Sequence, residues 1–150
     1  MALEYGCTGD NLVKALASYK GVKRRFTYQI KTDDLVYVDD YAHHPTEINA
    51  LHQAVREMHP NKKVLGIFQP HLYSRTRDFA TDFAKSLSQF DQLFLLDIYP
   101  ARELPMEGVT SEWLLSMVNS LDKKLVTKSN LVQEILQSDA EVIVTIGAGD

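Results

Sequence analysis

The chain has 150 residues, with 16 Lys and Arg against 20 Asp and Glu, which gives a formal net charge of −4. Hydrophobic residues make up 45% and charged residues 24%, a composition that indicates one compact domain and excludes a disordered chain. The mild acidity argues against a broad electrostatic surface for nucleic acid. The only cysteine, Cys7, excludes a disulfide framework within the chain and a metal site built from several cysteines.

Neither a membrane-spanning segment nor a secretory signal is predicted. The longest purely apolar runs, such as residues 93–96, are far too short to cross a bilayer. The N-terminus lacks a basic region followed by an apolar stretch. We therefore expect a cytoplasmic protein, or a piece of one, without a membrane partner.

The chain begins with one predicted helix and two predicted strands. Apolar residues at helical spacing predict a helix over residues 10–19, with Asp10 as its N-cap. Residues 26–30 and 35–38 have the composition of strands. The turn at residues 31–34 is short enough to join these two strands into an antiparallel hairpin.

From residue 45 onward, predicted helices and strands alternate. The helices are expected over residues 45–59, from Ser74 or Thr76 to 90, over 110–118 and over 129–136; the strands are expected over 64–68, 93–98, 125–126 and 142–146. This alternation indicates a parallel sheet with helices on both faces. The strands are apolar without strict alternation, as expected when both faces are covered. We predict an α/β three-layer sandwich with a mostly parallel sheet of about six strands.

Polar loops follow the carboxyl ends of four predicted strands, and open α/β sheets bind ligands at this edge. These loops cover residues 39–45, 69–77, 99–103 and 147–150. A parallel sheet brings several of them together. The edge that they share is therefore the candidate site.

Two arginines, Arg75 and Arg77, lie in the first turn of a predicted helix, where the helix already carries partial positive charge. This arrangement favours a bound anion, either a carboxylate or a phosphate. The alternative is a pair of solvated arginines that contact Asp78, Asp82 or another loop. The residues alone leave both interpretations open.

Histidines and aspartates follow the second strand. Adjacent histidines point in different directions and no third ligand has a suitable spacing, so His44 is expected to cap a helix or form hydrogen bonds rather than bind metal. The carboxylates of Asp39 and Asp40 are suited to bind Mg²⁺ or to accept hydrogen bonds from ribose hydroxyls. The alternative is that the two residues are simply the polar end of a strand. No Gly-x-x-x-x-Gly-Lys-Ser/Thr loop is present, so a phosphate cradle for ATP would lie on another segment.

Several motifs, taken in order, resemble the C-terminal part of the alanine-adding ligases in the ATP-dependent muramyl ligase family. They are GVKRRF at 21–26, DDYAHHPTE at 39–47, FQPH at 68–71 with SRTRDF at 74–79, YPARE at 99–103, and the closing GAG at 147–149. The resemblance runs from about Asp10 to the end of the chain. It implies that residues 21–150 form a Rossmann-like C-terminal domain that continues slightly past Asp150. Residues 1–20 would be the last helix and linker of a preceding central ATPase domain.

The resemblance also implies an activity. The family member joins L-alanine to UDP-N-acetylmuramate with hydrolysis of ATP to ADP and phosphate, a step of peptidoglycan precursor synthesis. The implied partners are these three substrates and the N-terminal and central domains of the same chain. ATP and Mg²⁺ would be held mainly by the central domain, so we expect this fragment alone to be inactive.

The resemblance carries over to individual residues. Asp40 matches a position that touches the ATP ribose, and Tyr41 lies beside the nucleotide. His43 and His71 match histidines of the amino-acid pocket, with His43 as the catalytic candidate. Arg75 matches an arginine that holds the alanine carboxylate. No residue of this chain is matched to a metal.

One position departs from the family pattern. An arginine often follows the position of His71, whereas this chain has Leu72. The departure leaves open whether one arginine or two, with Arg77 as the second, hold the alanine carboxylate. Arg77 is two residues from Arg75 along the helix, which turns its side chain away.

Two alternative functions belong to other classes. A stand-alone nucleotide- or anion-binding module would bind ATP tightly without catalysis. A small hydrolase using the histidines with Asp39 and Asp40 would show metal-dependent turnover. The missing phosphate loop counts against both alternatives.

Overall fold

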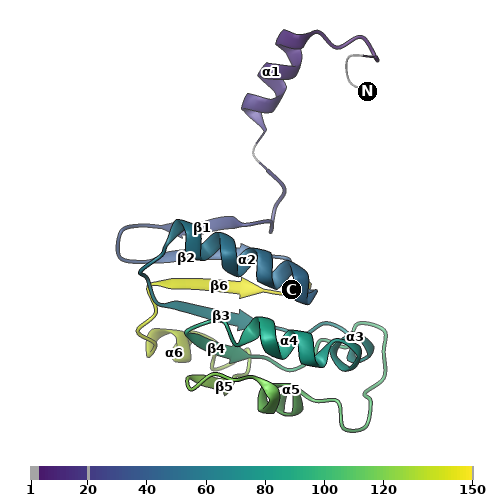
Figure 1. The fold of residues 1–150 in the computed structure, drawn as a ribbon, viewed down its shortest axis with the longest axis vertical. Coiled ribbons are helices and arrows are strands. Elements are labelled where there is room, and N and C mark those ends of the chain that lie inside the picture. Colours follow the sequence, from purple (N-terminus) through teal and green to yellow (C-terminus); the bar gives the residue numbers. More distant parts are fainter. Residues whose placement is uncertain (1–3, 20, 150) are drawn as a thin grey trace.

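The computed structural model describes residues 4–19 and 21–149. Among these residues, six strands form one sheet in the order β1-β2-β6-β3-β4-β5 (Figure 1). The strands are β1 (Thr27–Lys31), β2 (Val36–Asp40), β3 (Val64–Phe68), β4 (Gln92–Leu95), β5 (Lys123–Leu125) and β6 (Val142–Ile146). The first two strands form an antiparallel hairpin, and every other neighbouring pair is parallel. The predicted α/β fold is therefore confirmed.

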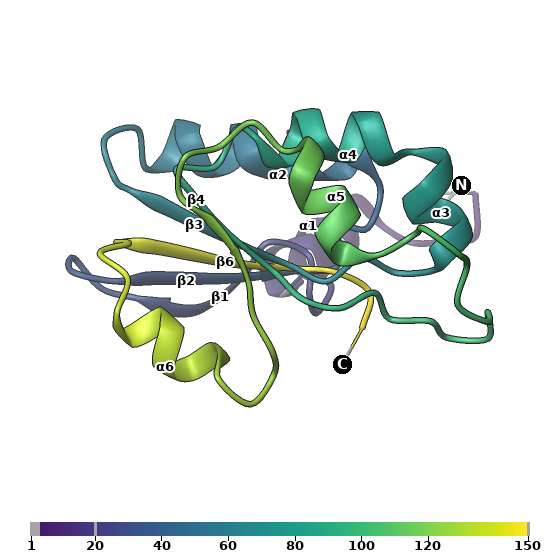
Figure 2. The same cartoon turned by 90° about the horizontal axis from the view of Figure 1, so that it is seen from below.

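Helices cover both faces of the sheet unequally. The helices are α1 (Gly9–Ser18), α2 (Pro45–Met58), α3 (Tyr73–Asp78), α4 (Ala80–Leu87), α5 (Ser111–Met117) and α6 (Leu131–Leu136). Figure 2 shows α2, α4 and α5 on one face of the sheet and α6 on the other. These layers build the three-layer sandwich that the sequence predicts.

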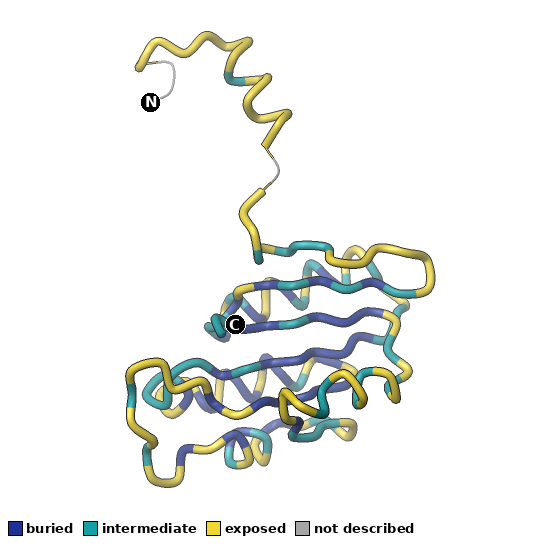
Figure 3. The backbone as a smooth tube through the Cα atoms, turned by 180° about the vertical axis from the view of Figure 1, so that it is seen from behind, coloured by how far each residue is buried: buried dark blue, intermediate teal, exposed yellow. Residues whose placement is uncertain are grey.

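The core has two parts, one on each side of the sheet. All five residues of β3 are buried; Val64 and Phe68 belong to the cluster under α2 and α4, whereas Leu65 and Ile67 belong to the cluster under α6. This division explains why the strand is apolar without alternation. Figure 3 shows the buried sheet as a dark band and α1 as almost wholly exposed.

The first helix has no partner in the described part of the chain. α1 contains no buried residue, and the side chains of Val13 and Leu16 are 66% and 65% exposed. Figure 1 shows it standing apart from the sheet. The helix prediction is confirmed, but its N-cap is Thr8, whose hydroxyl accepts the amide of Asn11, and not Asp10.

The single helix predicted from Ser74 or Thr76 to Phe90 is wrong. The chain breaks at Phe79 into α3 and α4, and no side chain of α3 caps its own start. Phe79 is 37% exposed, and its ring lies edge-on to the ring of His44, with the two ring centroids 4.7 Å apart. The apolar stripe misled the prediction, because Phe79 packs against a loop and not in the core.

Several element ends also differ from the predictions. β2 extends through Asp39 and Asp40, because both residues pair with β6 at the sheet centre. β4 ends at Leu95 instead of residue 98, and β5 lies over 123–125 instead of 125–126. α6 begins at Leu131 rather than at residue 129. The missed strand residues of β2 and β5 are Asp39, Asp40, Lys123 and Lys124, whose polar side chains have low strand propensity.

No helix in the described ranges combines the length and apolar character needed to cross a membrane.

Candidate functional site

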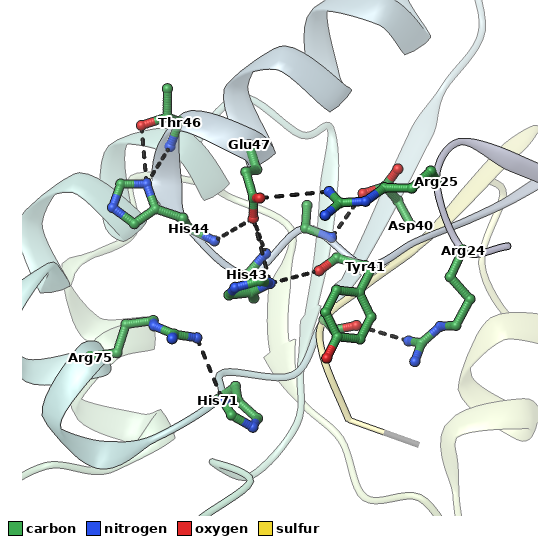
Figure 4. Close-up of polar contacts among 12 residues, drawn as sticks. Arg24, Arg25, Asp40, Tyr41, His43, His44, Thr46, Glu47, His71 and Arg75 are labelled. Carbon is green, nitrogen blue, oxygen red and sulfur yellow. Dashed lines mark hydrogen bonds and ion pairs between the residues drawn. The ribbon is translucent and has the colours of Figure 1, made fainter. Parts of the chain in front are cut away.

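Two loops that lie far apart in the sequence meet at the carboxyl edge of the sheet. His43 follows β2 and His71 follows β3, and β6 lies between these two strands. Figure 4 shows both histidines facing the same region as Arg75 of α3. The ring of His71 stacks on Tyr99 of the next loop, with ring centroids 5.6 Å apart. The parallel sheet thus brings together three of the loops that the sequence singled out.

The start of α2 fixes the two-histidine loop. Nδ1 of the His44 ring accepts a hydrogen bond from the backbone amide of Thr46 at 3.3 Å, and Pro45 occupies the first turn of α2. The Glu47 carboxylate accepts the amides of His43 at 2.9 Å and His44 at 3.2 Å. The predicted capping role of His44 is therefore confirmed. Sequence reasoning missed Glu47, although a glutamate three residues after an N-cap is a known signal.

The hydrogen bonds of His43 and His71 indicate that a different ring nitrogen carries the proton in each neutral ring. The Nδ1 of His43 lies 2.9 Å from the carbonyl oxygen of Tyr41, which can only accept, so Nδ1 carries the proton. The Nδ1 of His71 lies 3.4 Å from a guanidinium nitrogen of Arg75, which can only donate. In the neutral rings, Nε2 of His43 is therefore an acceptor and Nε2 of His71 is a donor.

The environment of His71 keeps its ring neutral. Burial lowers the pKa of His71, the positive charge of Arg75 and the neighbouring His43 ring lower it further, and Glu103 acts in the other direction. A neutral ring is the state that can accept a hydrogen bond from Arg75. The pKa shift and the geometry thus agree.

The two arginines of the 69–77 loop have different surroundings. Arg77 pairs with Asp78 at 2.8 Å, which is the plain alternative that the sequence left open. No carboxylate of the described residues lies within ion-pair distance of Arg75. Its guanidinium instead contacts the ring of His71 at 3.4 Å.

The start of α3 is already occupied by a carboxylate of the chain itself. Glu103 accepts the amide of Ser74 at 2.9 Å and also the Ser74 hydroxyl. The hydrogen bonds from Ser74 hold the pKa of Glu103 below its usual range. The prediction that the helix end itself favours a bound anion is corrected by this contact, and only the Arg75 side chain supports such a role. Sequence reasoning missed Glu103, because it lies 29 residues from Ser74.

Strained backbone borders the site. Leu72 has φ of 72° and Ala101 has φ of 51°, a region that residues with a side chain rarely adopt. Such residues cost about 1–3 kcal/mol each and persist where surrounding contacts enforce them. The amide of Leu72 donates to the Tyr99 carbonyl at 2.9 Å, and its carbonyl accepts the Thr76 hydroxyl at 2.8 Å. These bonds fix the direction of the chain between His71 and α3.

The two adjacent aspartates have separate roles within the fold. Asp40 is 8% exposed, and its two carboxylate oxygens accept the amides of Phe26 at 2.6 Å and Ala42 at 2.8 Å. The Asp39 carboxylate accepts hydrogen bonds from Arg24 at 3.2 Å and Thr145 at 2.9 Å. Consecutive residues of a strand point to opposite faces, so the two carboxylates do not share one site.

Tyr41 lies at the surface beside this pair. Its side chain is 36% exposed, and the guanidinium carbons of Arg24 and Arg25 lie 5.2 and 5.9 Å from the centre of its ring. The two guanidinium groups therefore place positive charge against a partly exposed aromatic ring. The basic run at residues 23–25 was the sequence signal for this arrangement, although the contact itself could not be predicted.

A separate cavity of about 570 Å³ lies on the α6 side of the sheet. Arg24 crosses its rim and donates to the carbonyls of Gly147 at 2.8 Å and Gly149 at 2.9 Å. The lining contains neither histidine of the site and not Arg75. The closing glycines thus bind Arg24, and Asp150 lies outside the described residues.

Replacing Asp40 with asparagine should destabilise the fold. One asparagine oxygen can accept only one of the two amides, and its NH₂ group would face the other N–H donor. We expect the free energy of unfolding to fall by about 1–3 kcal/mol, measured by urea denaturation. Asp34→Asn, in the exposed turn before β2, is the matched control. Equal midpoints for both variants would show that the Asp40 bonds contribute nothing.

Replacing Arg75 with alanine should raise the pKa of His71 toward its ordinary value, because a positive charge near the ring disappears while burial remains. A proton NMR titration of the ring measures this shift. Arg77→Ala is the control, since the Arg77 guanidinium pairs with Asp78. A His71 titration that stays the same in Arg75→Ala would contradict the contact between the two side chains.

Comparison with known proteins identifies the family. A family model described as "Mur ligase, glutamate ligase domain" matches residues 24–149. The UDP-N-acetylmuramate–L-alanine ligase of Flavobacterium johnsoniae is 66% identical over all 150 residues, which correspond to 33% of its own length. The ligase of the same name from Porphyromonas gingivalis is 49% identical over 146 residues, or 32% of its length. The chain thus spans about a third of the length of the curated relatives that it matches.

Solved structures agree with this assignment. The UDP-N-acetylmuramate–alanine ligase of Thermotoga maritima aligns with a TM-score of 0.73 and 25% identity, over 99% of this chain and 32% of its own. A bifunctional folylpolyglutamate/dihydrofolate synthase of Yersinia pestis aligns with a TM-score of 0.71 at 14% identity, over 97% of this chain and 34% of its own, which shows a shared fold alone. Together with the site geometry, these matches establish that the chain belongs to the Mur ligase family and that its sheet domain is the C-terminal domain of these ligases.

Proposed function

We propose that the longer protein to which this chain corresponds joins L-alanine to UDP-N-acetylmuramate with hydrolysis of ATP, and that this domain binds the amino acid. The observation that carries the proposal is the convergence of His43, His71 and Arg75, which has no carboxylate partner of its own among the described residues. The names of the relatives support the choice of substrates. The product would enter peptidoglycan synthesis in the cytoplasm.

The proposed reaction has two steps. ATP phosphorylates the carboxylate of the muramate, and ADP leaves. The amine of L-alanine then attacks the acyl phosphate, so that an amide bond forms and phosphate is released. An amine attacks only with a free lone pair, so its ammonium proton must be removed first.

The residues of this chain fit the amino-acid half of that reaction. The Arg75 guanidinium would hold the alanine carboxylate through charge-assisted hydrogen bonds. The Nε2–H of His71 would donate to the same carboxylate. The free Nε2 of His43 would accept a proton from the alanine ammonium group, which is the catalytic role that we assign to it.

The fit to the nucleotide is partial. Tyr41 offers an exposed ring beside the ATP ribose or base. A carboxylate has about four lone-pair sites, so Asp40 keeps acceptor capacity for a ribose hydroxyl beside its two amide bonds. The described residues contain no cluster of three or more possible metal ligands. We therefore assign Mg²⁺ and the ATP phosphates to other parts of the longer protein.

We further propose that residues 1–20 belong to the preceding, central ATPase domain and residues 21–150 to the C-terminal domain. The family model begins at residue 24. The exposed apolar side chains of α1, among them Val13 and Leu16, suit a surface that another domain covers.

The 150-residue chain alone should show neither ligation nor ATP hydrolysis, because no phosphate loop positions the γ-phosphate and Mg²⁺. The longer protein should form the amide from L-alanine, UDP-N-acetylmuramate and ATP, as measured by product chromatography and phosphate release. Sub-micromolar ATP binding by the chain alone would favour a stand-alone nucleotide module. Metal-dependent hydrolysis by the chain alone would favour the hydrolase alternative.

In the longer protein, Arg75→Ala should raise the KM for L-alanine far more than the KM for ATP. Loss of a charge-assisted pair of about 2–3 kcal/mol corresponds to a factor of about 30–150 in kcat/KM. Lysine at this position should rescue only partly, since a point charge does not replace a planar fork. Arg77→Ala is the matched control. A KM for L-alanine within about twofold of the parent would place the carboxylate elsewhere.

A further inference from the structure

The two oxygens of the Glu47 carboxylate face different parts of the molecule. Oε2 accepts the amides of His43 and His44, and it lies 3.5 Å from Nδ1 of the His43 ring. Oε1 lies 3.6 Å from the guanidinium of Arg25. Figure 4 shows Glu47 between the two-histidine loop and Arg25. One side chain thus touches both segments.

These contacts exceed what a helix cap needs. A capping box requires only that the glutamate accepts the amide of the N-cap residue, here His44. Burial raises the pKa of Glu47, but the hydrogen bond from the His43 amide and the charges of His43 and Arg25 outweigh it and hold the pKa below its usual range. Glu47 is therefore ionised at neutral pH, as an ion pair with Arg25 requires.

Residues 21–26 form the connector between α1 and the sheet domain, and their backbone fixes the direction of Arg25. Its neighbours Arg24 and Phe26 have φ of 57° and 46°, in the left-handed region. The Asp40 carboxylate holds the Phe26 amide, and the Tyr41 amide donates to the Arg24 carbonyl at 2.7 Å. Arg25 is thereby held between two anchored residues that follow the segment leading from α1.

We propose that Glu47 is a positioning residue, which orients the His43 ring and couples it through Arg25 to the connector between α1 and the sheet domain. A movement of the connector would then change the position of His43. The effect on ligation rests on the proposed function, whereas the orientation of the ring does not.

Two variants separate this role from that of a simple cap. In Glu47→Gln the side-chain oxygen can still accept hydrogen bonds from the backbone amides of His43 and His44. The side-chain NH₂ group then faces the Arg25 guanidinium, and the two groups cannot form a hydrogen bond because both are donors. In Glu47→Ala both contacts are lost. Glu57→Gln, on the exposed side of the same helix, is the matched control, because it also exchanges a glutamate for a glutamine.

The first readout uses the 150-residue chain and NMR. In Glu47→Ala, the His43 and His44 amides should exchange with solvent about tenfold faster or more, because their acceptor is gone. The His43 ring keeps the Tyr41 carbonyl as acceptor for Nδ1 but loses the carboxylate beside it, so its ring-proton chemical shifts and its nuclear Overhauser contacts to Tyr41 should change. In Glu47→Gln, amide exchange should stay within about threefold of the parent. Unchanged ring-proton shifts and contacts of His43 in Glu47→Ala would overturn the proposal.

The second readout uses the longer protein. Glu47→Gln should lower kcat about tenfold and leave the KM for ATP within about twofold, because the ring that accepts the proton is displaced. Arg25→Met should lower kcat similarly, and the double variant should be no worse than either single one. Parent-like kcat in Glu47→Gln would reduce Glu47 to a helix cap. If the parent itself forms no amide, the proposed function fails, and the NMR readout alone decides the positioning role.

Discussion

The pairing of β6 with both β2 and β3 is the constraint on which the candidate site depends. Asp40 and Phe68 pair with the same residue of β6, Ile146, so both strands end at the same level. Two strand spacings, about 10 Å, therefore separate the starts of the two loops that carry the histidines. This distance allows side chains from both loops to face one small ligand. A different strand order would keep every helix and strand and lose the site.

Carboxylates that accept backbone amides hold this edge of the sheet in place. Asp40 binds the connector, Glu47 binds the two-histidine loop, and Glu103 binds the start of α3. Each bond is assisted by charge and is therefore stronger than a bond between neutral groups. The Asp40 contact also holds Phe26, whose φ of 46° lies in the left-handed region. The acidic groups thus shape the site, while Arg75 remains available for a ligand.

The connector is as firmly tied to the sheet domain as the loops are. Arg24 binds the carbonyls of Gly147 and Gly149 as well as Asp39, so it ties the connector to β2 and to the residues that follow β6. Before the connector, α1 contains no buried residue. The proposed division after residue 20 lies just before this anchored segment and before residue 24, where the family model begins.

The sequence by itself determined the fold class, and it predicted which edge of the sheet carries the candidate site. Apolar strands bounded by capping residues and prolines, such as residues 64–68 before the polar loop of His71, are local signals that survive in any context. The capping role of His44 was also predictable, because an N-cap acts within three residues. Only the tertiary structure decided that Phe79 breaks a helix, that Asp40 binds Phe26, and that Glu103 occupies the start of α3. These contacts join residues far apart in the chain, or depend on what a side chain packs against, and no local pattern encodes either.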